Sequence, residues 1–109
     1  MQQVFPEAIM QLAQPAIALP ESVTVRLSKA SSHVVYYLTA SEDLEYPPHA
    51  HAAQFGVVLE GRIDITTESG TRTYQKGDRY TLQAGMRHGV KLYAGFAEIS
   101  YLEDPEYFG

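Results

Sequence analysis

The chain has 109 residues, a length typical of one domain with a single buried core. It contains no cysteine, which excludes disulfides, thiolate metal sites and cysteine nucleophiles, so nitrogen and oxygen must bind any metal. Its formal net charge is −5 and its eight basic residues are scattered, so we expect no nucleic-acid partner. We also expect a cytoplasmic protein without a membrane partner, because neither a leader-like N-terminus nor an apolar run of membrane-spanning length is visible.

The first 22 residues are predicted to form an N-terminal arm in front of one β-domain, residues 23–109. Within the arm, Glu7–Gln14 is either a short helix that ends before Pro15 or an extended segment. The stretch Val4–Leu19 is apolar, is interrupted by prolines and is poorly placed to fill a barrel. We therefore expect a homodimer in which arms or sheets of two copies cover each other.

The rest of the chain alternates short runs rich in Val, Ile, Thr and Tyr with turns, a pattern typical of antiparallel strands. The turn Glu68-Ser69-Gly70 is predicted to join two of them, with Gly70 at positive φ. Short strands without a long helix predict an all-β closed barrel or jelly roll. The expected strands are Val23–Leu27, Val34–Thr39, Phe55–Leu59, Arg62–Thr67, Thr71–Gln75, Arg79–Leu82, His88–Tyr93 and Ala97–Leu102.

Three of the four histidines are placed as ligands of one ion. His49 and His51 stand at i and i+2, so on an extended strand both imidazoles point to the same face. His88 begins another predicted strand and can project into the same barrel interior. His33, on the strand that carries Val35 and Tyr37, is interpreted as a structural or rim residue.

Two motifs between Asp43 and His88 resemble those of the cupin superfamily. The first motif reads Gly, five residues, His-x-His, three or four residues, Glu, six residues, Gly, and corresponds here to Asp43, His49, His51, Gln54 and Gly61. The second reads Gly, five residues, Pro-x-Gly, two residues, His, three residues, Asn, and corresponds to Gly77, Gln83, Gly85, His88 and Leu92. Asp43, Gln83 and Leu92 thus replace Gly, Pro and Asn. The resemblance implies a double-stranded β-helix, the jelly-roll barrel of cupins, that binds a metal.

The carboxylate position of the first motif is occupied by glutamine. Counting back from Gly61 selects Gln54, whereas counting forward from His51 selects Phe55, which cannot bind a metal. We prefer Gln54, because the turn that joins the two strands can absorb the missing residue, and its Oε1 is a neutral oxygen donor. The resemblance then implies one divalent ion (Mn, Fe, Co, Ni, Cu or Zn). Its ligands would be His49, His51, Gln54 and His88.

Such a site carries no negative charge of its own, so we expect a small oxygenated, anionic metabolite to balance the ion. Cupins include isomerases, decarboxylases, dioxygenases and non-catalytic binding proteins, so the fold does not select a reaction. The missing carboxylate disfavours a dioxygenase, because non-haem iron oxygenases commonly use two histidines and a carboxylate. The alternative to an enzyme is a sugar- or acid-binding or sensing module.

Three further residues are predicted to contact the small-molecule ligand. They are Tyr37, Met86 and Arg87, of which Met86 and Arg87 adjoin His88 and could line the mouth of the cavity. For Arg87, a solvated side chain beside a turn is the alternative. Glu60, in the turn before Gly61, is interpreted as facing solvent.

Overall fold

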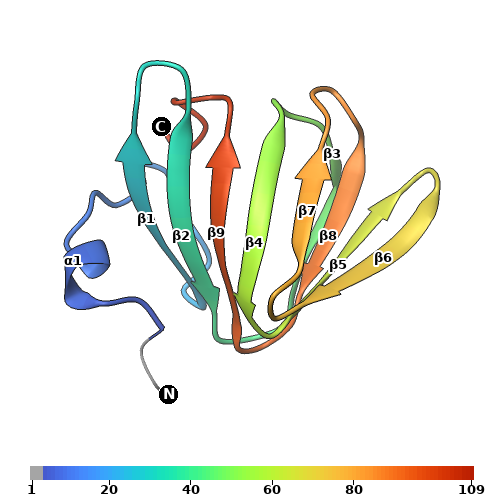
Figure 1. Ribbon diagram of the computed structural model, residues 1–109, viewed down its shortest axis with the longest axis horizontal. Helices are drawn as coiled ribbons and strands as arrows, with labels where there is room; N and C mark the ends of the chain where they lie inside the picture. Colours follow the sequence, from blue (N-terminus) through green and yellow to red (C-terminus); the bar gives the residue numbers. More distant parts are fainter. Residues whose placement is uncertain (1–3) are drawn as a thin grey trace.

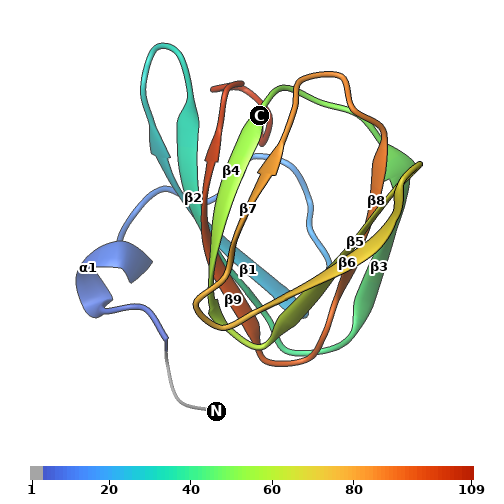
Figure 2. The same cartoon turned by 45° about the vertical axis from the view of Figure 1, so that its right-hand side comes forward.

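The computed structural model describes residues 4–109, which form nine β-strands in two antiparallel sheets (Figure 1). The five-stranded sheet contains, in spatial order, β1 (Val23–Lys29), β2 (Val34–Ala40), β9 (Phe96–Leu102), β4 (Gln54–Glu60) and β7 (Arg79–Leu82). The four-stranded sheet contains β3 (Leu44–His49), β8 (His88–Leu92), β5 (Arg62–Thr67) and β6 (Gly70–Gln75). The two sheets face each other across the interior (Figure 2). The predicted all-β jelly-roll barrel is confirmed.

All eight predicted strands are present, with bounds that differ by at most two residues. The ninth, β3, was not predicted as a strand, because its Leu-Glu-Tyr-Pro-Pro-His sequence lacks the alternation of apolar residues. β3 lies at the edge of its sheet and pairs only with β8. Its register shifts between Tyr46 and His49, where Pro47 and Pro48 have no N–H to donate.

The inward side chains of both sheets form one core. On β2, Val34, Tyr36, Leu38 and Ala40 are buried, while the residues between them are only partly buried. This period of two is the pleat of a strand, and it decides which side chains reach the interior.

Two turn glycines adopt backbone angles that other residues avoid. Gly70, in the predicted hairpin between β5 and β6, has φ of 118°. Gly61, between β4 and β5, has φ of 74°, and a Cβ there would lie 2.8 Å from the Cα of Phe96. The motif glycine at position 61 therefore serves both the turn and the close approach of β9.

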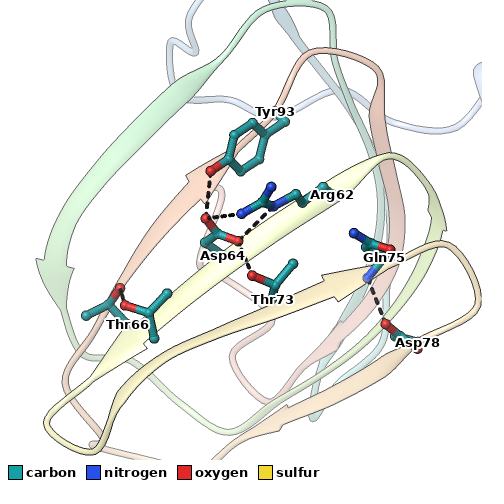
Figure 3. A network of polar contacts seen from close by, with 8 residues as sticks. Arg62, Asp64, Thr66, Thr73, Gln75, Asp78 and Tyr93 are labelled. Atoms are coloured by element: carbon teal, nitrogen blue, oxygen red, sulfur yellow. Dashed lines mark hydrogen bonds and ion pairs between the residues drawn. The ribbon is translucent and has the colours of Figure 1, made fainter.

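A polar network covers the outer face of β5, β6 and the end of β8 (Figure 3). The Asp64 carboxylate accepts hydrogen bonds from Arg62 at 3.1 and 3.2 Å and from Thr73 and Tyr93 at 2.7 Å. Arg62 and Lys91 also lie over the Tyr93 ring. Desolvation alone would raise the pKa of Asp64, but the three hydrogen-bond donors outweigh it and lower the pKa. The network thus holds the solvent side of this sheet together.

The N-terminal arm packs against the barrel of its own chain. Its one helix, α1 (Glu7–Met10), lies outside the five-stranded sheet (Figure 1). Only the first turn of the predicted stretch Glu7–Gln14 is helical. Phe5 is buried, with its ring 5.6 Å from that of Tyr37, and Ala13 bridges to Leu27. The homodimer stays a prediction: Phe5 is covered within the chain, whereas Val4 and Ile17 of the same arm are 37% and 46% exposed. None of the helices in the described range is long and apolar enough to cross a membrane.

Candidate metal centre

Three histidines, those predicted from their spacing, meet at one place in the barrel. His49 ends β3 and pairs with His88, the first residue of β8, while His51 lies in the connection from β3 to β4. Their ring centroids are 4.6 to 5.3 Å apart. One potential ligand nitrogen from each ring lies within 4.8 Å of the others. The fold therefore brings together side chains that are up to 39 positions apart in the sequence.

Each of the three rings is fixed by a backbone carbonyl. The Nδ1 atoms of His49, His51 and His88 lie 3.0, 2.6 and 2.9 Å from the carbonyl oxygens of Pro47, Ala52 and Met86, respectively. A carbonyl oxygen only accepts, so each Nδ1 carries the proton and donates it. The lone pair of each neutral ring then resides on Nε2, which is the arrangement that metal-binding histidines have.

The environment of His88 favours its neutral form. His88 is 2% exposed, and this burial is the main reason why its pKa is lowered. The neighbouring His51 and His49 lower the pKa further, and the hydrogen bond to Met86 opposes the shift. A neutral imidazole is the form that binds a metal ion. The three histidines therefore fit a divalent ion by donor type and tautomer, and His88 also by its charge.

The histidines line a cavity of about 330 Å³ inside the barrel. Most of its wall is apolar and comes from both sheets, chiefly Leu38, Ile63, Ile65, Leu82, Val90, Leu92 and Leu102. The arm, which passes between the two sheets in Figure 2, contributes Ile17 to Pro20, and the C-terminal turn contributes Tyr107 and Phe108. The Tyr107 ring lies 5.4 Å from that of His51. No lysine or arginine of the described residues lines this cavity.

Gln54 lines the same cavity, whereas Phe55 does not. Gln54 is 7% exposed, and Phe55, on the opposite face of β4, is 41% exposed. Gln54 Nε2 lies 2.6 Å from the Tyr36 hydroxyl, 2.8 Å from Ser100 Oγ and 3.1 Å from the Tyr80 hydroxyl. Its Oε1 makes no hydrogen bond to the described residues. This placement favours Gln54 over Phe55 as the oxygen donor, and metal binding by Gln54 stays a prediction.

The three residues predicted to contact the ligand do not line the cavity. Tyr37 points outward and packs against Phe5, since β2 turns Tyr36 to the interior instead. Arg87 is exposed, and Met86 is partly buried against the core. Ligand contact by Tyr37, Met86 and Arg87 therefore has no support from the cavity.

The remaining two residues that we interpreted lie away from the histidine cluster. His33, in the turn between β1 and β2, has its ring 4.6 Å from that of Tyr101 and its Nδ1 3.0 Å from Ser32 Oγ. Glu60 forms an ion pair with Lys76 at 3.1 Å and is 45% exposed. Both placements agree with a structural or solvent-facing role.

Sequence reasoning missed an acidic group inside the barrel. Glu98 on β9 is 3% exposed, lines the cavity and accepts a hydrogen bond from the Tyr80 hydroxyl. Burial raises its pKa to about 7, although the Tyr80 hydrogen bond acts in the opposite direction. The strand alternation contained the signal, because Phe96, Glu98, Ser100 and Leu102 share one face of β9 and its other members suit the core.

Comparisons with known proteins agree with the strand pattern and the motifs. A family model described as "Cupin domain" matches residues 35–94. No curated protein matches the chain. Among solved structures, an RmlC-like cupin from Shewanella frigidimarina NCIMB 400 is similar with a TM-score of 0.73 and 16% identity, over 92% of this chain and 91% of that one.

Two further solved structures belong to proteins with more specific names. KdgF from Halomonas sp. has a TM-score of 0.67 and 14% identity, over 80% of this chain and 84% of that one. A variant of oxalate decarboxylase from B. subtilis has a TM-score of 0.72 and 13% identity, over 91% of this chain but only 29% of that one. Identities this low show a shared fold and leave the function to the site.

Proposed function

The chain belongs to the cupin domain family, and we propose that it binds one divalent metal ion through His49, His51 and His88 and acts on a small oxygenated metabolite in its barrel. The observation that carries this proposal is that all three imidazoles are oriented in the same way, each by a backbone carbonyl. Each Nδ1 is hydrogen-bonded to a backbone carbonyl, so each Nε2 remains available, and one potential ligand nitrogen from each ring lies within 4.8 Å of the others.

A divalent ion at this place would supply a Lewis acid that polarises an oxygen of the metabolite. The chain's own residues set what that metabolite is. The cavity of about 330 Å³ admits only a small molecule, and its largely apolar wall suits a hydrocarbon portion. Three imidazoles bring no negative charge, so an anionic oxygen of the ligand balances the ion.

The charge of the metabolite is limited by the cavity wall. No basic side chain of the described residues lines the cavity, so the ion alone compensates an incoming anion. Glu98 is itself acidic and would repel a second negative group. These observations favour a ligand with one anionic head and an apolar remainder.

A non-catalytic binding module is the second candidate. The observation that favours it is that Ile17 to Pro20 of the arm and Tyr107 and Phe108 of the C-terminal turn line the cavity in addition to both sheets, which suits the binding of a small molecule. The two candidates share the ligand class and differ in turnover. A ligand that stabilises the loaded protein and is recovered unchanged supports the binding module.

Elemental analysis of protein purified without an affinity tag tests the metal site. We expect about one ion per chain in the wild type and strong loss in His49→Ala and His88→Ala, because either substitution removes a ligand and leaves the set incomplete. His33→Ala is the matched control and should retain the ion, since His33 lies at the β1–β2 turn. Equal metal content in all four proteins would contradict the proposal.

Thermal unfolding of the metal-loaded protein with small acids and sugars tests the ligand class. Monoanionic acids with an apolar tail should raise the unfolding temperature most. Oxalate belongs in the panel because oxalate decarboxylase shares the fold, and its second negative charge should weaken its binding here. A preference for neutral sugars would count against an anionic ligand.

A further inference from the structure

The barrel interior contains an ionisable group that the proposed metal site does not use. Glu98 is 3% exposed and projects from β9 into the same cavity as the histidines. Glutamate is almost never this buried unless it is paired with a positive charge or metal. Here its one hydrogen-bond partner among the described residues is the hydroxyl of Tyr80. A carboxyl group in such a place needs an explanation.

Only one of the two carboxyl oxygens of Glu98 has a hydrogen-bond partner among the described residues. Tyr80 donates to Oε1, and Oε2 makes no hydrogen bond within residues 4–109. No fully buried side-chain nitrogen or oxygen of the described residues lacks a partner. Oε2 is therefore in contact with open space, and since Glu98 lines the cavity, that space is the cavity. A ligand in the barrel can reach this oxygen.

The surroundings allow the carboxyl to exist in both protonation states near neutral pH. The titratable groups that act on Glu98 are the buried Tyr36 of β2 and Tyr80 of β7, both neutral phenols whose pKa is raised by burial and then by Glu98. Burial raises the pKa of Glu98 to about 7. A group poised near the working pH is suited to both accepting and returning a proton.

Strand register places Glu98 deeper in the barrel than the metal-binding end. Gln54 pairs with Leu102 across β4 and β9, whereas Glu98 pairs with Val58, four residues further along β4. The Tyr80 hydroxyl spans this interval, because it contacts both Gln54 and Glu98. A ligand whose oxygen lies at the histidines would extend its remaining atoms towards Glu98.

We propose that Glu98 exchanges a proton with the cavity ligand, and that the ligand is a small enolisable carbonyl acid with an apolar tail. This inference rests on the proposed function, whose ion would bind the oxygens of such a ligand. The Glu98 carboxylate takes a proton from the carbon next to the carbonyl. The electron pair of that C–H bond forms a C=C bond, and the carbonyl π pair moves to oxygen. Return of a proton from the neutral Glu98 to the enolate restores the starting charges.

The probe is 4-methyl-2-oxopentanoate, whose C3 hydrogens exchange with deuterium in D2O and can be followed by NMR. The metal-loaded wild type should accelerate this exchange, and Glu98→Gln should slow it about 100-fold or more, the range for one acid-base group. Glu45→Gln, a change of an exposed glutamate on β3, is the matched control and should exchange as the wild type does.

A second measurement needs no turnover. The probe 3,3-dimethyl-2-oxobutanoate has no hydrogen at C3, so it can bind but cannot exchange. Calorimetry near pH 7 in buffers of different ionisation enthalpy should show proton uptake on binding to the wild type, because the incoming anion favours the neutral form of Glu98. This uptake should be absent in Glu98→Gln.

Tyr80→Phe should keep the exchange but with a pH profile displaced upward, because Tyr80 positions the carboxyl and stabilises its ionised form.

The outcomes distinguish the two proposals. Protein that binds neither ion nor probe overturns the proposed function and this inference with it. Protein that binds both, but exchanges no faster than solution or equally fast in Glu98→Gln, leaves the metal site intact and overturns the role of Glu98. Loss of exchange in Tyr80→Phe with exchange retained in Glu98→Gln would likewise overturn it.

Discussion

The phenol ring of Tyr80 lies directly over the backbone of Gly56 on the neighbouring strand. A Cβ at position 56 would overlap the ring carbons of Tyr80 and lie 2.6 Å from its hydroxyl oxygen. Gly56 pairs with Tyr80 across β4 and β7 and shares the inward face of β4 with Gln54. The glycine therefore makes the space in which the Tyr80 hydroxyl reaches both Gln54 and Glu98.

We predict that Gly56→Ala destabilises the fold by about 1–3 kcal/mol, the usual cost of overpacking a core. The methyl group would push the Tyr80 ring out of place and break its hydrogen bonds to the interior. Urea unfolding of the two proteins measures the difference.

Gly89→Ala is the matched control for this change. Gly89 also lies in a strand and has no positive φ, and a Cβ there would find its nearest neighbour at an ordinary 3.6 Å, in Pro48. Its effect should stay within about 0.5 kcal/mol. Combined with Tyr80→Leu, Gly56→Ala should cost less than on the wild-type background, since the clash is with Tyr80. Additive costs would show that the strain comes from elsewhere.

The strands could be predicted because they depend on local pattern, and the histidine cluster because its three residues stand at the spacing of two motifs. The period of two gave the strands. The i and i+2 spacing predicted that His49 and His51 meet, which they do although His51 lies beyond the end of β3. The same alternation turns Tyr36, and not the predicted ligand contact Tyr37, to the interior. Glu98 was not predicted as an interior residue, because sequence alone does not show that the Tyr80 hydroxyl is there to donate a hydrogen bond to a buried carboxyl group.

Two other features depend on contacts that pattern does not reveal. β3 was missed because its pairing with β8 tolerates two prolines at a sheet edge. The arm was expected to take part in a homodimer, which stays a prediction, and its Phe5 packs against Tyr37 of the same chain. Both the β3–β8 pairing and the Phe5–Tyr37 contact are long-range packing, which outweighs local propensity.

We predict that the arm contributes to stability through Phe5. Phe5→Ala should lower the free energy of unfolding by about 3–5 kcal/mol, because it empties a site that is now 6% exposed. The neighbouring Val4 is 37% exposed, so Val4→Ala should change it by no more than about 0.5 kcal/mol. Chemical denaturation at several protein concentrations measures both and also reports any dimer, whose stability would rise with concentration.

We predict that Gln54→Glu tightens metal binding about 10-fold or more and weakens binding of anionic ligands. The substitution keeps the size of the side chain but places a charged oxygen beside the ion. The hydroxyls of Tyr36 and Ser100 can turn to donate to a carboxylate where they now accept from the amide. Titration with Mn, Ni and Zn, followed by oxalate, measures the two opposite effects.

Phe55→Glu separates the two ways of counting the motif. Phe55 is 41% exposed on the outer face of β4, so a carboxylate there should leave metal affinity within a few tenths of a kcal/mol. Unchanged metal affinity in Gln54→Glu, or stronger oxalate binding, would remove Gln54 from the ligand set. A gain in metal affinity in Phe55→Glu alone would restore the alternative count.

The last prediction concerns the pH dependence of stability that Glu98 imposes. Its pKa rises from 4.5 to about 7 on folding, because burial penalises the charged form. Between these values the folded state binds more protons than the unfolded state, so the free energy of unfolding falls as the pH rises. At about 1.4 kcal/mol per pKa unit, the full loss is about 3 kcal/mol, complete above pH 7.

The histidines titrate in the same range, so the comparison must isolate Glu98. In metal-free protein His88, whose pKa is lowered by burial, contributes stability that increases as the pH rises, the opposite sign. The difference between wild type and Glu98→Gln cancels that contribution, because both proteins retain His88. Glu98→Gln should therefore gain stability relative to the wild type from pH 4.5 to 7 and hold that gain at pH 8. In Tyr80→Phe the wild-type decline should extend to higher pH, since the hydroxyl that stabilises the ionised carboxyl is gone. A difference between wild type and Glu98→Gln that does not change with pH would show that Glu98 titrates as an ordinary exposed glutamate, and the open carboxyl oxygen in the cavity would then have no special proton affinity.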